Sequence, residues 1–368
     1  MPSRRSGDPL RFGIVGPGLV GRLHAAALAR IDDARLVAVA GSRPGSERTA
    51  RLAEDYGTRA ADSFEAMIGD GSLDAVIVCT PHPLHARQAI EAARAGLHVV
   101  VEKPMALTAA DCSAMIAAAD EAGVVLSVIS QRRWQPAAQR VKAAIDEGRI
   151  GVPGLATVEV LGWRGPEYYA MDPWRGTRAG ECGGVLVNQA VHQLDLLCWF
   201  LGPIAEVDGW TANLNHPDIE VEDTAVAIAR FGSGAIASIV ASNSQRPGLY
   251  ARVHVHGRNG ASVGVETDKG SSFVAGISEQ TPPSNDIWTI PGEEAEPERW
   301  AAEDAAALVG IDIATWFHEL QLRDIVAAIR EGRPPAVDGR DGRAAVELMA
   351  AIDEASRTGA RVRLAALD

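Results

Sequence analysis

The chain has 368 residues, of which 47% are hydrophobic and 23% are charged, and its formal net charge is −13. This composition is typical of a globular protein, and the length predicts two domains. The acidic balance argues against a nucleic-acid partner, because nucleic-acid binders normally present a basic face.

Neither a membrane segment nor a disulfide framework is indicated. No apolar stretch is long enough to span a bilayer, and the polar residues Met1 to Pro9 are not followed by the apolar run of a signal peptide. The four cysteines, Cys79, Cys112, Cys182 and Cys198, form no CxxC pair and are interpreted as buried thiols in a reducing compartment. These features predict a cytoplasmic protein without a membrane partner.

From Arg11 to Ile129, short apolar runs alternate with amphipathic stretches. Strands are expected over Phe12–Val15, Leu36–Ala40, Ala75–Cys79, His98–Val101 and Val124–Ile129. Helices are expected over Leu19–Arg30, Glu47–Tyr56, Leu84–Ala95 and Thr108–Ala119. This alternation predicts right-handed crossovers and a doubly wound parallel sheet, and hence an α/β domain over residues 9–130.

The second half has a different pattern. After a helix expected at Pro136–Glu147, strands follow one another with turn signals between them, at Ala156–Gly162, Val207–Leu214, Thr224–Phe231, Ala235–Ala241 and Arg252–His256. The remaining expected elements are a helix from Asn188 to Phe200, a long surface excursion over Thr267–Glu298, helices at Trp316–Arg330 and Arg343–Arg357, and a strand near Arg361–Leu364. The pattern predicts an α+β domain over residues 131–368 with a large, open, mostly antiparallel sheet.

The segment Gly16-Pro17-Gly18-Leu19-Val20-Gly21 directly follows the first expected strand and opens the first helix. In such a turn one glycine makes the tight bend, one lets the backbone approach a pyrophosphate, and one allows close packing of helix and strand. The helix N-terminus then faces the phosphate charge. A glycine-rich turn is often only a turn, but its position between strand and helix favours a dinucleotide-binding Rossmann domain.

The residues after the second strand indicate which dinucleotide binds. NAD is usually held by an acid at this position, whereas the 2′-phosphate of NADP repels acids and pairs with Arg or Ser. Here the strand is followed by Gly41-Ser42-Arg43, with Arg48 a turn later, and no acid precedes Glu47. NADP(H) is therefore predicted in preference to NAD(H). The alternative is that this segment is a solvated loop.

Two further motifs lie at expected carboxyl ends of strands, where open α/β sheets bind ligands. They are Cys79-Thr80-Pro81-His82-Pro83-Leu84-His85 and, after Gly96-Leu97-His98-Val99-Val100-Val101, Glu102-Lys103-Pro104. With this spacing the chain resembles the Gfo/Idh/MocA oxidoreductases. The resemblance implies that Lys103 lies beside the nicotinamide and the reacting carbon, and that the Lys103–Pro104 peptide is cis. A lysine at a strand end is otherwise more often a surface charge.

The second half carries its own resemblance to this family. The segment Glu181-Cys182-Gly183-Gly184-Val185-Leu186-Val187-Asn188-Gln189-Ala190-Val191-His192-Gln193-Leu194-Asp195 is similar to the family's glycine-rich turn and following helix with D-x-x-x-H-x-x-D. Asn188 and His192 are one turn apart and are expected on one helix face. Asn188 replaces the family's Asp, and an amide can orient a hydroxyl or the His192 ring but cannot take a proton. Lys103 and His192 are thus the catalytic candidates, with Asp195 as an anchor for the helix.

The candidate contacts fall into two groups. Cofactor contacts are expected from Gly16, Gly18, Leu19, Val20, Gly21, Ser42, Arg43, Arg48, Thr80, Pro81, His82, His85, Glu102 and Lys103. Substrate contacts are expected from Lys103, Gln131, Trp163, Trp174, Arg175, Asn188 and His192, with Tyr168 and Tyr169 in the same segment as the tryptophans. Aromatic faces can stack on a hydroxyl-rich ring while a guanidinium binds its oxygens, although any one aromatic residue could equally fill the core. No metal site is predicted.

The resemblance implies an NAD(P)-dependent dehydrogenase or reductase that transfers a hydride between nicotinamide and the hydroxyl-bearing or carbonyl carbon of a sugar, sugar derivative or cyclitol. His192 would remove the alcohol proton in oxidation, and Lys103 would hydrogen-bond the same oxygen. Alternatives are an NAD-dependent glycosidase with transient redox, whose glycine- and histidine-rich signature is not apparent, and a non-catalytic dinucleotide or sugar sensor of the same fold. A purely structural partner protein is disfavoured by the density of motifs.

Apolar residues of the second sheet predict self-association. Val226, Ile228, Ile236 and Ile239 are expected on the sheet face that no helix covers. Such a face is costly to leave in water, so a homo-oligomer, either a dimer or a tetramer, is predicted through this sheet.

Overall fold

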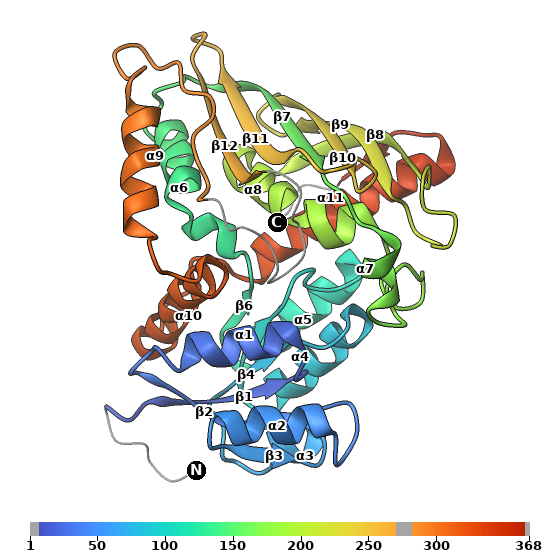
Figure 1. Cartoon of the computed structure of the whole chain (residues 1–368), viewed down its shortest axis with the longest axis vertical. Coiled ribbons are helices and arrows are strands. Elements are labelled where there is room, and N and C mark those ends of the chain that lie inside the picture. The colour runs from blue at the N-terminus through green and yellow to red at the C-terminus, as the bar shows by residue number, and fades with distance from the viewer. Residues whose placement is uncertain (1–6, 270–281, 365–368) are drawn as a thin grey trace. The chain divides into compact units, whose positions relative to one another are not determined.

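The computed structural model describes residues 7–269 and 282–364, which form two compact units (Figure 1). Unit 1 comprises Met1–Gln131 and Ala314–Arg343, and unit 2 comprises Arg132–Ile313 and Ala344–Asp368. The first division falls beside the expected boundary at residue 130. The expected second domain, residues 131–368, differs from unit 2 in one segment, because residues 314–343 group with unit 1.

Unit 1 is built on a six-stranded sheet in the order β3-β2-β1-β4-β5-β6, and all of its strand pairs are parallel. The strands are β1 (Leu10–Val15), β2 (Ala34–Ala40), β3 (Arg59–Ala61), β4 (Ala75–Val78), β5 (His98–Val101) and β6 (Leu126–Val128). The order reverses between β1 and β4, which makes their carboxyl ends the topological switch point where ligands bind. The predicted doubly wound parallel sheet is confirmed. Strand β3 escaped prediction because it has only three residues, two of them exposed.

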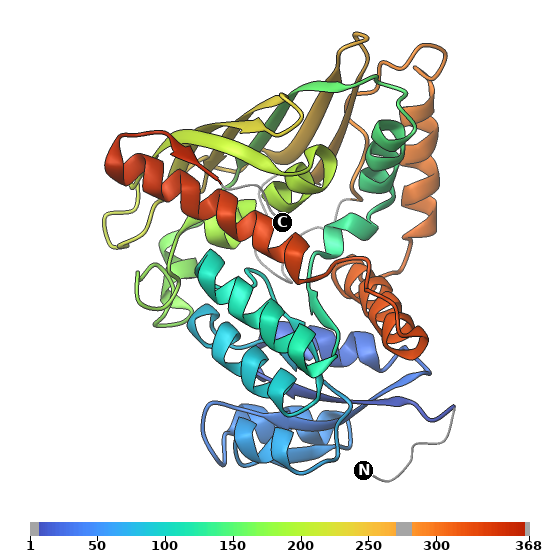
Figure 2. The ribbon, with the colours of Figure 1, turned by 180° about the vertical axis from the view of Figure 1, so that it is seen from behind.

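Helices cover both faces of this sheet, and Figure 2 shows α4 and α5 side by side on one of them. The helical elements of unit 1 are α1 (Leu19–Leu28), α2 (Glu47–Asp55), α3 (Phe64–Gly69), η1 (His82–Leu84), α4 (His85–Arg94), α5 (Ala109–Ala122) and most of α10 (Ile313–Glu331). Thr108, expected as the first residue of a helix, instead caps α5, because its hydroxyl accepts a hydrogen bond from the Asp111 N–H at 3.0 Å.

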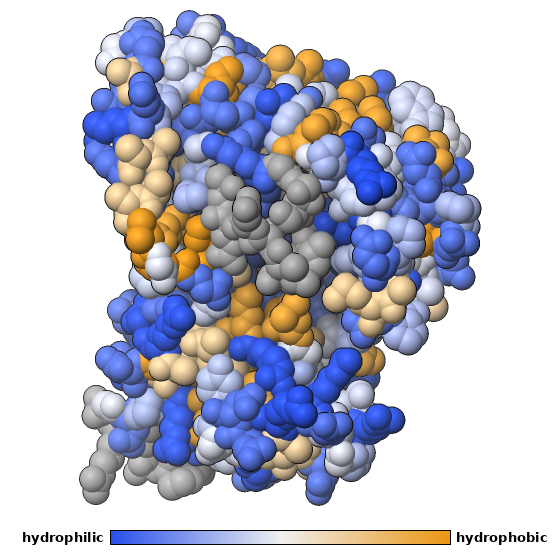
Figure 3. Space-filling model, in the orientation of Figure 1, coloured by the Kyte–Doolittle hydropathy of each residue, from blue (hydrophilic) through white to orange (hydrophobic). Residues whose placement is uncertain are grey.

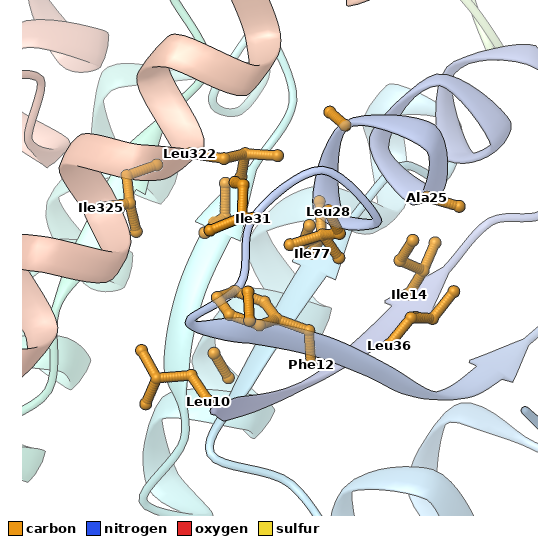
Figure 4. Packing of buried hydrophobic residues seen from close by; sticks show 14 of the residues in the cluster. Leu10, Phe12, Ile14, Ala25, Leu28, Ile31, Leu36, Ile77, Leu322 and Ile325 are labelled. Carbon is orange, nitrogen blue, oxygen red and sulfur yellow. The ribbon is translucent and has the colours of Figure 1, made fainter. Parts of the chain in front are cut away.

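The helix α10 belongs to unit 1 because its apolar side chains complete the core beside β1 (Figure 4). Leu322 and Ile325 are fully buried in the same cluster as Phe12, Leu28 and Ile31. The Gln321 amide donates to the Val128 carbonyl at 2.8 Å and accepts from the Ser130 N–H at 2.9 Å. Burial of side chains from a distant segment is worth about 1.5–3 kcal/mol for each large one, which explains why the chain returns here.

Unit 2 is built on a seven-stranded sheet in the order β12-β11-β7-β10-β9-β8-β13. Its strands are β7 (Pro153–Leu161), β8 (Ile204–Ala212), β9 (Thr224–Phe231), β10 (Ile236–Ser242), β11 (Tyr250–Gly257), β12 (Ser262–Lys269) and β13 (Val362–Arg363). Only the central pair of β7 and β10 is parallel, and the other pairs are antiparallel. The predicted large, mostly antiparallel sheet is confirmed.

Helical elements pack on one face of this sheet or along its edge. They are η2 (Gln131–Trp134), α6 (Pro136–Asp146), α7 (Pro166–Ala170), the π-helical turn η3 (Leu186–Ala190), α8 (Val191–Leu201), α9 (Glu296–Ala307) and most of α11 (Gly339–Thr358). The far end of α11 lies along β8 (Figure 2), where the Ser356 hydroxyl accepts a hydrogen bond from the Thr211 N–H at 2.8 Å. None of the helices among the described residues is long and apolar enough to cross a membrane.

The expected surface excursion over Thr267–Glu298 is corrected at both ends. Residues 267–269 complete β12, which pairs with β11, and residue 296 begins α9. Residues 270–281 lie outside the described residues. Polar residues hid both elements, because β12 ends in Glu266, Thr267, Asp268 and Lys269 and α9 is mostly exposed.

The sheet of unit 2 leaves apolar side chains in solvent on its other face. Trp210 is 70% exposed, Ile228 61%, Ile236 50% and Val226 45%, and Figure 3 shows apolar patches where β7, β9 and β10 lie. The placement of Ile239 on this face was wrong. Ile239 is fully buried, because strand residues alternate between faces and it lies an odd number of positions from Ile236.

The interpretation of all four cysteines as buried thiols is also corrected. Cys112 and Cys198 are buried, Cys79 is half-buried and Cys182 is exposed. Cys182 lies in the irregular loop before η3, where no element covers it.

Candidate functional site

The glycine-rich turn of unit 1 has the geometry that a pyrophosphate requires. Gly16 has a φ of +102°, and a Cβ there would lie 2.4 Å from the Cys79 carbonyl oxygen. A Cβ on Gly21 would lie 2.1 Å from the Gly16 carbonyl oxygen, whereas one on Gly18 would meet nothing within 4 Å. Two glycines are therefore fixed by close packing, and the third faces open space at the start of α1, where N–H groups are left for an anion.

The neighbouring candidates in α1 and after β2 are accessible. Leu19 is 54% exposed and Val20 is half-buried in the first turn of α1. Ser42, Arg43 and Arg48 are exposed beyond the end of β2. All five residues are therefore exposed enough to contact a nucleotide.

The motifs after β4 and β5 lie beside the glycine-rich turn, because β1, β4 and β5 are consecutive strands of the sheet. The Thr80 hydroxyl donates to the Gln88 side chain at 2.6 Å, and Pro81 and His82 begin η1. His85 is completely buried, with Nδ1 at 2.9 Å from the Pro104 carbonyl and Nε2 at 2.7 Å from the Thr80 carbonyl. His85 therefore lies between the two motifs, and its neutral ring can donate to one of the two carbonyls at a time. The sequence pattern predicts it instead as a direct cofactor contact.

The segment Glu102-Lys103-Pro104 directly follows β5. The Lys103–Pro104 peptide is cis, as the sequence resemblance predicts. Glu102 is 6% exposed, and its Oε2 accepts a hydrogen bond from the Lys103 N–H at 3.1 Å. Lys103 itself is half-buried. Lys103 thus lies just after the carboxyl end of β5 and is partly shielded from solvent.

Sequence reasoning missed two histidines that accompany Glu102. His24 of α1 and His318 of α10 are both buried, and the His24 Nε2 lies 2.7 Å from Glu102 Oε1. The three side chains place potential donor atoms within 4.8 Å of one another. His24 follows Gly21 by three residues, which could have signalled its position, but nothing in the sequence connects His318 with this place.

In unit 2 the predicted helix starts with an irregular turn. Residues 186–190 are π-helical and α8 continues from Val191, so the helix begins two residues before the expected Asn188. Asn188 and His192 are half-buried in a stretch that is otherwise almost entirely buried. Single π-helical turns are frequent at functional sites. Val187 and Trp199 of this stretch are half-buried as well, so exposure alone does not single out the two polar residues.

The loop before this helix packs closely against Glu222 and has an unusual backbone conformation at Cys182. Cys182 has a φ of +65°, in the left-handed region that non-glycine residues rarely adopt. A Cβ on Gly184 would lie 1.7 Å from the Glu222 carbonyl oxygen, so only glycine fits. The Glu222 carboxylate accepts from the Leu186 N–H at 3.2 Å, and burial raises the pKa of this carboxyl.

Asp195 has the anchoring role that the sequence predicts. It is 5% exposed and forms a two-point ion pair with Arg133, at 2.9 Å from Nε and 2.8 Å from Nη2. Both oxygens are thereby engaged within unit 2. A carboxylate held in this way fixes the helix and is not available as a base.

Aromatic and arginine side chains gather around α7, as the sequence pattern suggested. The Arg175 guanidinium lies over the rings of Tyr168 and Trp174, at 4.3 and 4.7 Å from their centroids. The Tyr168 hydroxyl lies 3.5 Å from the Gln189 amide, which connects this group to η3. Trp163 packs near His216 instead, and the centroids of these two rings are 5.7 Å apart.

Two buried residues of this region, Arg164 and His216, escaped the sequence prediction. Arg164 is buried, with its guanidinium 4.9 Å from the Tyr168 centroid. His216 is buried between the Asp223 carboxylate, at 2.8 Å, and the Arg164 carbonyl, at 2.7 Å. Gln131, predicted as a substrate contact, lies at the end of unit 1 in η2.

Comparisons with known proteins cover both halves of the chain. The family model described as "Oxidoreductase family, NAD-binding Rossmann fold" matches residues 10–130, and that described as "GFO/IDH/MocA C-terminal domain" matches residues 138–263. The myo-inositol 2-dehydrogenase of Thermotoga maritima is 29% identical over 92% of this chain and 94% of its own. The 1,5-anhydro-D-fructose reductase of Ensifer adhaerens is 30% identical over 95% of this chain and 97% of its own.

A solved structure is similar over the whole length. The WlbA dehydrogenase of Bordetella pertussis, in complex with NADH and UDP-GlcNAcA, is 34% identical with a TM-score of 0.86. The match covers 99% of this chain and 100% of that chain.

Proposed function

Because the chain belongs to the Gfo/Idh/MocA family of oxidoreductases, we propose that Lys103 and His192 are the catalytic residues of a nicotinamide-dependent sugar or cyclitol dehydrogenase. The enzyme transfers a hydride between the cofactor and the hydroxyl-bearing or carbonyl carbon of such a substrate. The observation that carries this function is that the open Gly18 turn, the Thr80 motif and Lys103 follow the consecutive strands β1, β4 and β5.

The residues have separate roles in the proposed reaction. A nicotinamide dinucleotide held by the Gly16–Gly21 turn would supply or accept the hydride. Lys103 hydrogen-bonds the reacting oxygen and stabilises negative charge that develops on it. His192 removes the alcohol proton, because imidazole is the side chain most often used as a general base. Asn188 orients the substrate or the His192 ring, and Arg175 with Trp174 and Trp163 binds sugar oxygens and faces.

The two alternatives of the same fold are disfavoured. The relatives reported above are named as dehydrogenases or reductases rather than as glycosidases or sensors. A sensor would also have no use for a lysine just after the carboxyl end of β5 and a half-buried histidine on a mostly buried helix.

A substrate panel tests the function directly. It contains myo-inositol, scyllo-inositol, 1,5-anhydro-D-fructose, simple aldoses and UDP-GlcNAcA, each with NAD(H) and NADP(H), and turnover is followed by nicotinamide absorbance. We expect stoichiometric redox change with at least one member. Glycoside cleavage without net redox change would instead support the glycosidase, and tight dinucleotide binding without turnover would support the sensor.

The cofactor preference is a separate proposal: NADP binds more tightly than NAD through Ser42 and Arg43, with Arg48 nearby. A charge-assisted contact of this kind is worth roughly 1.5–3 kcal/mol, so Arg43→Ala should weaken NADP about 10- to 150-fold and leave NAD nearly unchanged. Fluorescence titration measures both dissociation constants, and Arg51→Ala, an exposed arginine paired with Glu47, is the matched control. NAD binding tenfold tighter than NADP in the unmodified protein would contradict the proposal.

We also propose that the exposed sheet face of unit 2 forms a homo-oligomer, a dimer or a tetramer. Removing Trp210, Val226, Ile228 and Ile236 from water would provide the driving force. Light scattering at micromolar concentration should give a mass of two or four chains, and Ile228→Glu should lower it. Val309→Glu, at a position 79% exposed beyond α9, should not. A monomeric unmodified protein would exclude this assembly.

A further inference from the structure

A buried cluster of titratable side chains stands behind Lys103 in unit 1. His24 comes from α1, Glu102 from the end of β5 and His318 from α10, and they are 0%, 6% and 6% exposed. The His24 and His318 rings meet edge to face, with centroids 5.2 Å apart. The mechanism proposed above uses neither histidine, so their position beside Glu102 requires an explanation.

The hydrogen bonds define the protons in this cluster. Glu102 Oε1 only accepts when ionised, so the 2.7 Å contact places a proton on His24 Nε2. The second oxygen, Oε2, accepts from the Lys103 backbone N–H at 3.1 Å. His318 donates from Nδ1 to the Ala314 carbonyl at 2.6 Å, and its Nε2 is 3.9 Å from Glu102, beyond hydrogen-bonding distance. The His24 side chain thus contacts the carboxylate directly.

Hydrogen bonds also account for the close approach of these donor atoms. They are near enough to one another for an ion, but His24 Nε2 and Glu102 Oε1 are already paired, and His318 Nε2 is 3.9 Å from Glu102. The 2.7 Å separation is that of a hydrogen bond to a carboxylate. A network of hydrogen bonds therefore accounts for the arrangement.

The electrostatics agree with an ionised Glu102. Burial by itself would raise the pKa of Glu102, but the hydrogen bond and charge of His24, with His318 and Lys103, outweigh it and hold that pKa at about 2. Burial, with the neighbouring His24, lowers the pKa of His318 to about 4, so this ring is neutral at physiological pH. The other titratable groups near Glu102 are the Cys79 thiol, whose pKa is raised by burial and by the Glu102 charge, and buried His85, whose pKa is lowered by burial.

We propose that His24 is a positioning residue for Lys103: its Nε2–H holds Glu102 as a buried anion, which fixes the Lys103 backbone and keeps the Lys103 ammonium protonated. This inference rests on the proposed function in taking Lys103 as the catalytic ammonium. His85 supports the same segment from the other side, through the Pro104 carbonyl. The reacting oxygen is then always faced by a protonated Lys103. No proton has to reach Lys103 before hydride transfer.

The chain offers an unusually direct test, because lysine occurs at only three positions, Lys103, Lys142 and Lys269. Competitive acetylation over a pH series, read by peptide mass spectrometry, gives the pH at which each lysine is half-labelled. This readout needs no substrate, so it stays informative even if the proposed function fails. Lys142 and Lys269 serve as internal controls.

Two variants of His24 separate positioning from packing. His24→Phe keeps a ring but removes the donor, and His24→Gln keeps an N–H that can reach Glu102. In His24→Phe the half-labelling pH of Lys103 should fall by about 1 to 3 units, because the opposite charge beside it is lost. Turnover should fall on the order of 10²-fold with little change in cofactor affinity. His24→Gln should restore both readouts in large part.

Leu28→Ala is the matched control, since Leu28 is buried in the apolar core one turn further along α1. It should lower the melting temperature and leave the labelling of Lys103 unchanged. If His24→Phe fails to fold, Glu102→Gln removes the charge at nearly constant shape and should produce the same fall in half-labelling pH. An unchanged Lys103 in the folded variants, or a stoichiometric metal ion in the purified protein, would overturn the proposal.

Discussion

Lys103→Ala is expected to lower kcat by at least about 10²-fold, because removal of one group that stabilises developing negative charge typically costs that much. Cofactor affinity should change far less, since the charge matters mainly where electrons move in the transition state. Steady-state kinetics with the substrate identified in the panel, together with fluorescence titration of the cofactor, measure the two effects separately.

Two further variants sharpen this prediction. Lys103→Arg keeps the positive charge but spreads it over a planar group, so partial activity is expected. Lys142→Ala, which removes an ammonium on α6 that pairs with Asp146, should leave kcat unchanged. If Lys103→Ala retained near-normal turnover, the lysine would be a structural residue at the strand end.

His192→Ala is expected to lower turnover by about 10²–10⁴-fold, the usual contribution of general acid–base catalysis. The effect should appear in kcat at neutral pH and leave the dissociation constant of the cofactor nearly unchanged, because His192 belongs to unit 2 and the glycine-rich turn to unit 1. Gln193→Ala on the following helix position is a suitable comparison, since Gln193 is buried and contacts Thr267. Near-normal turnover in His192→Ala would make Lys103 the first candidate for the base.

Asn188→Asp probes the same step without removing a group. A carboxylate one turn from His192 should stabilise the imidazolium form, so the base is available only at higher pH. The pH at which oxidation reaches half of its maximal rate should therefore move upward. An unchanged pH profile would indicate that Asn188 and His192 do not interact during the reaction.

Local patterns in the sequence were sufficient for most of the elements near the site. The strand–turn–helix of Gly16 to Gly21, the end of β5 at Val101 and the helix that carries His192 are all encoded within short segments. Their signals are glycines with a steric reason and apolar runs with a clear period, which do not depend on distant parts of the chain. Asp195 was interpreted as an anchor from its place in the family-like helix motif, although its partner Arg133 was not identified.

What remained hidden were the elements whose local signal is weak. Strand β3 is short, β12 and α9 are polar, and the π-helical turn at 186–190 has the same composition as an ordinary helix. Ile239 was assigned to the wrong face because the alternation of side chains between the two faces of the sheet was not applied to each residue of the expected strand.

By itself, therefore, the sequence determined the class of both domains and the family, and it supplied the candidates Lys103 and His192, because these depend on short motifs with local steric and chemical requirements. Only the tertiary structure decided that α10 returns to unit 1, that His24 and His318 meet at Glu102, and that His85 joins the Thr80 and Pro104 carbonyls. Those pairings join residues up to about three hundred positions apart. Burial of apolar surface and the pairing of a buried charge stabilise these contacts. Neither effect produces a repeating pattern in the sequence from which the contacts could be predicted.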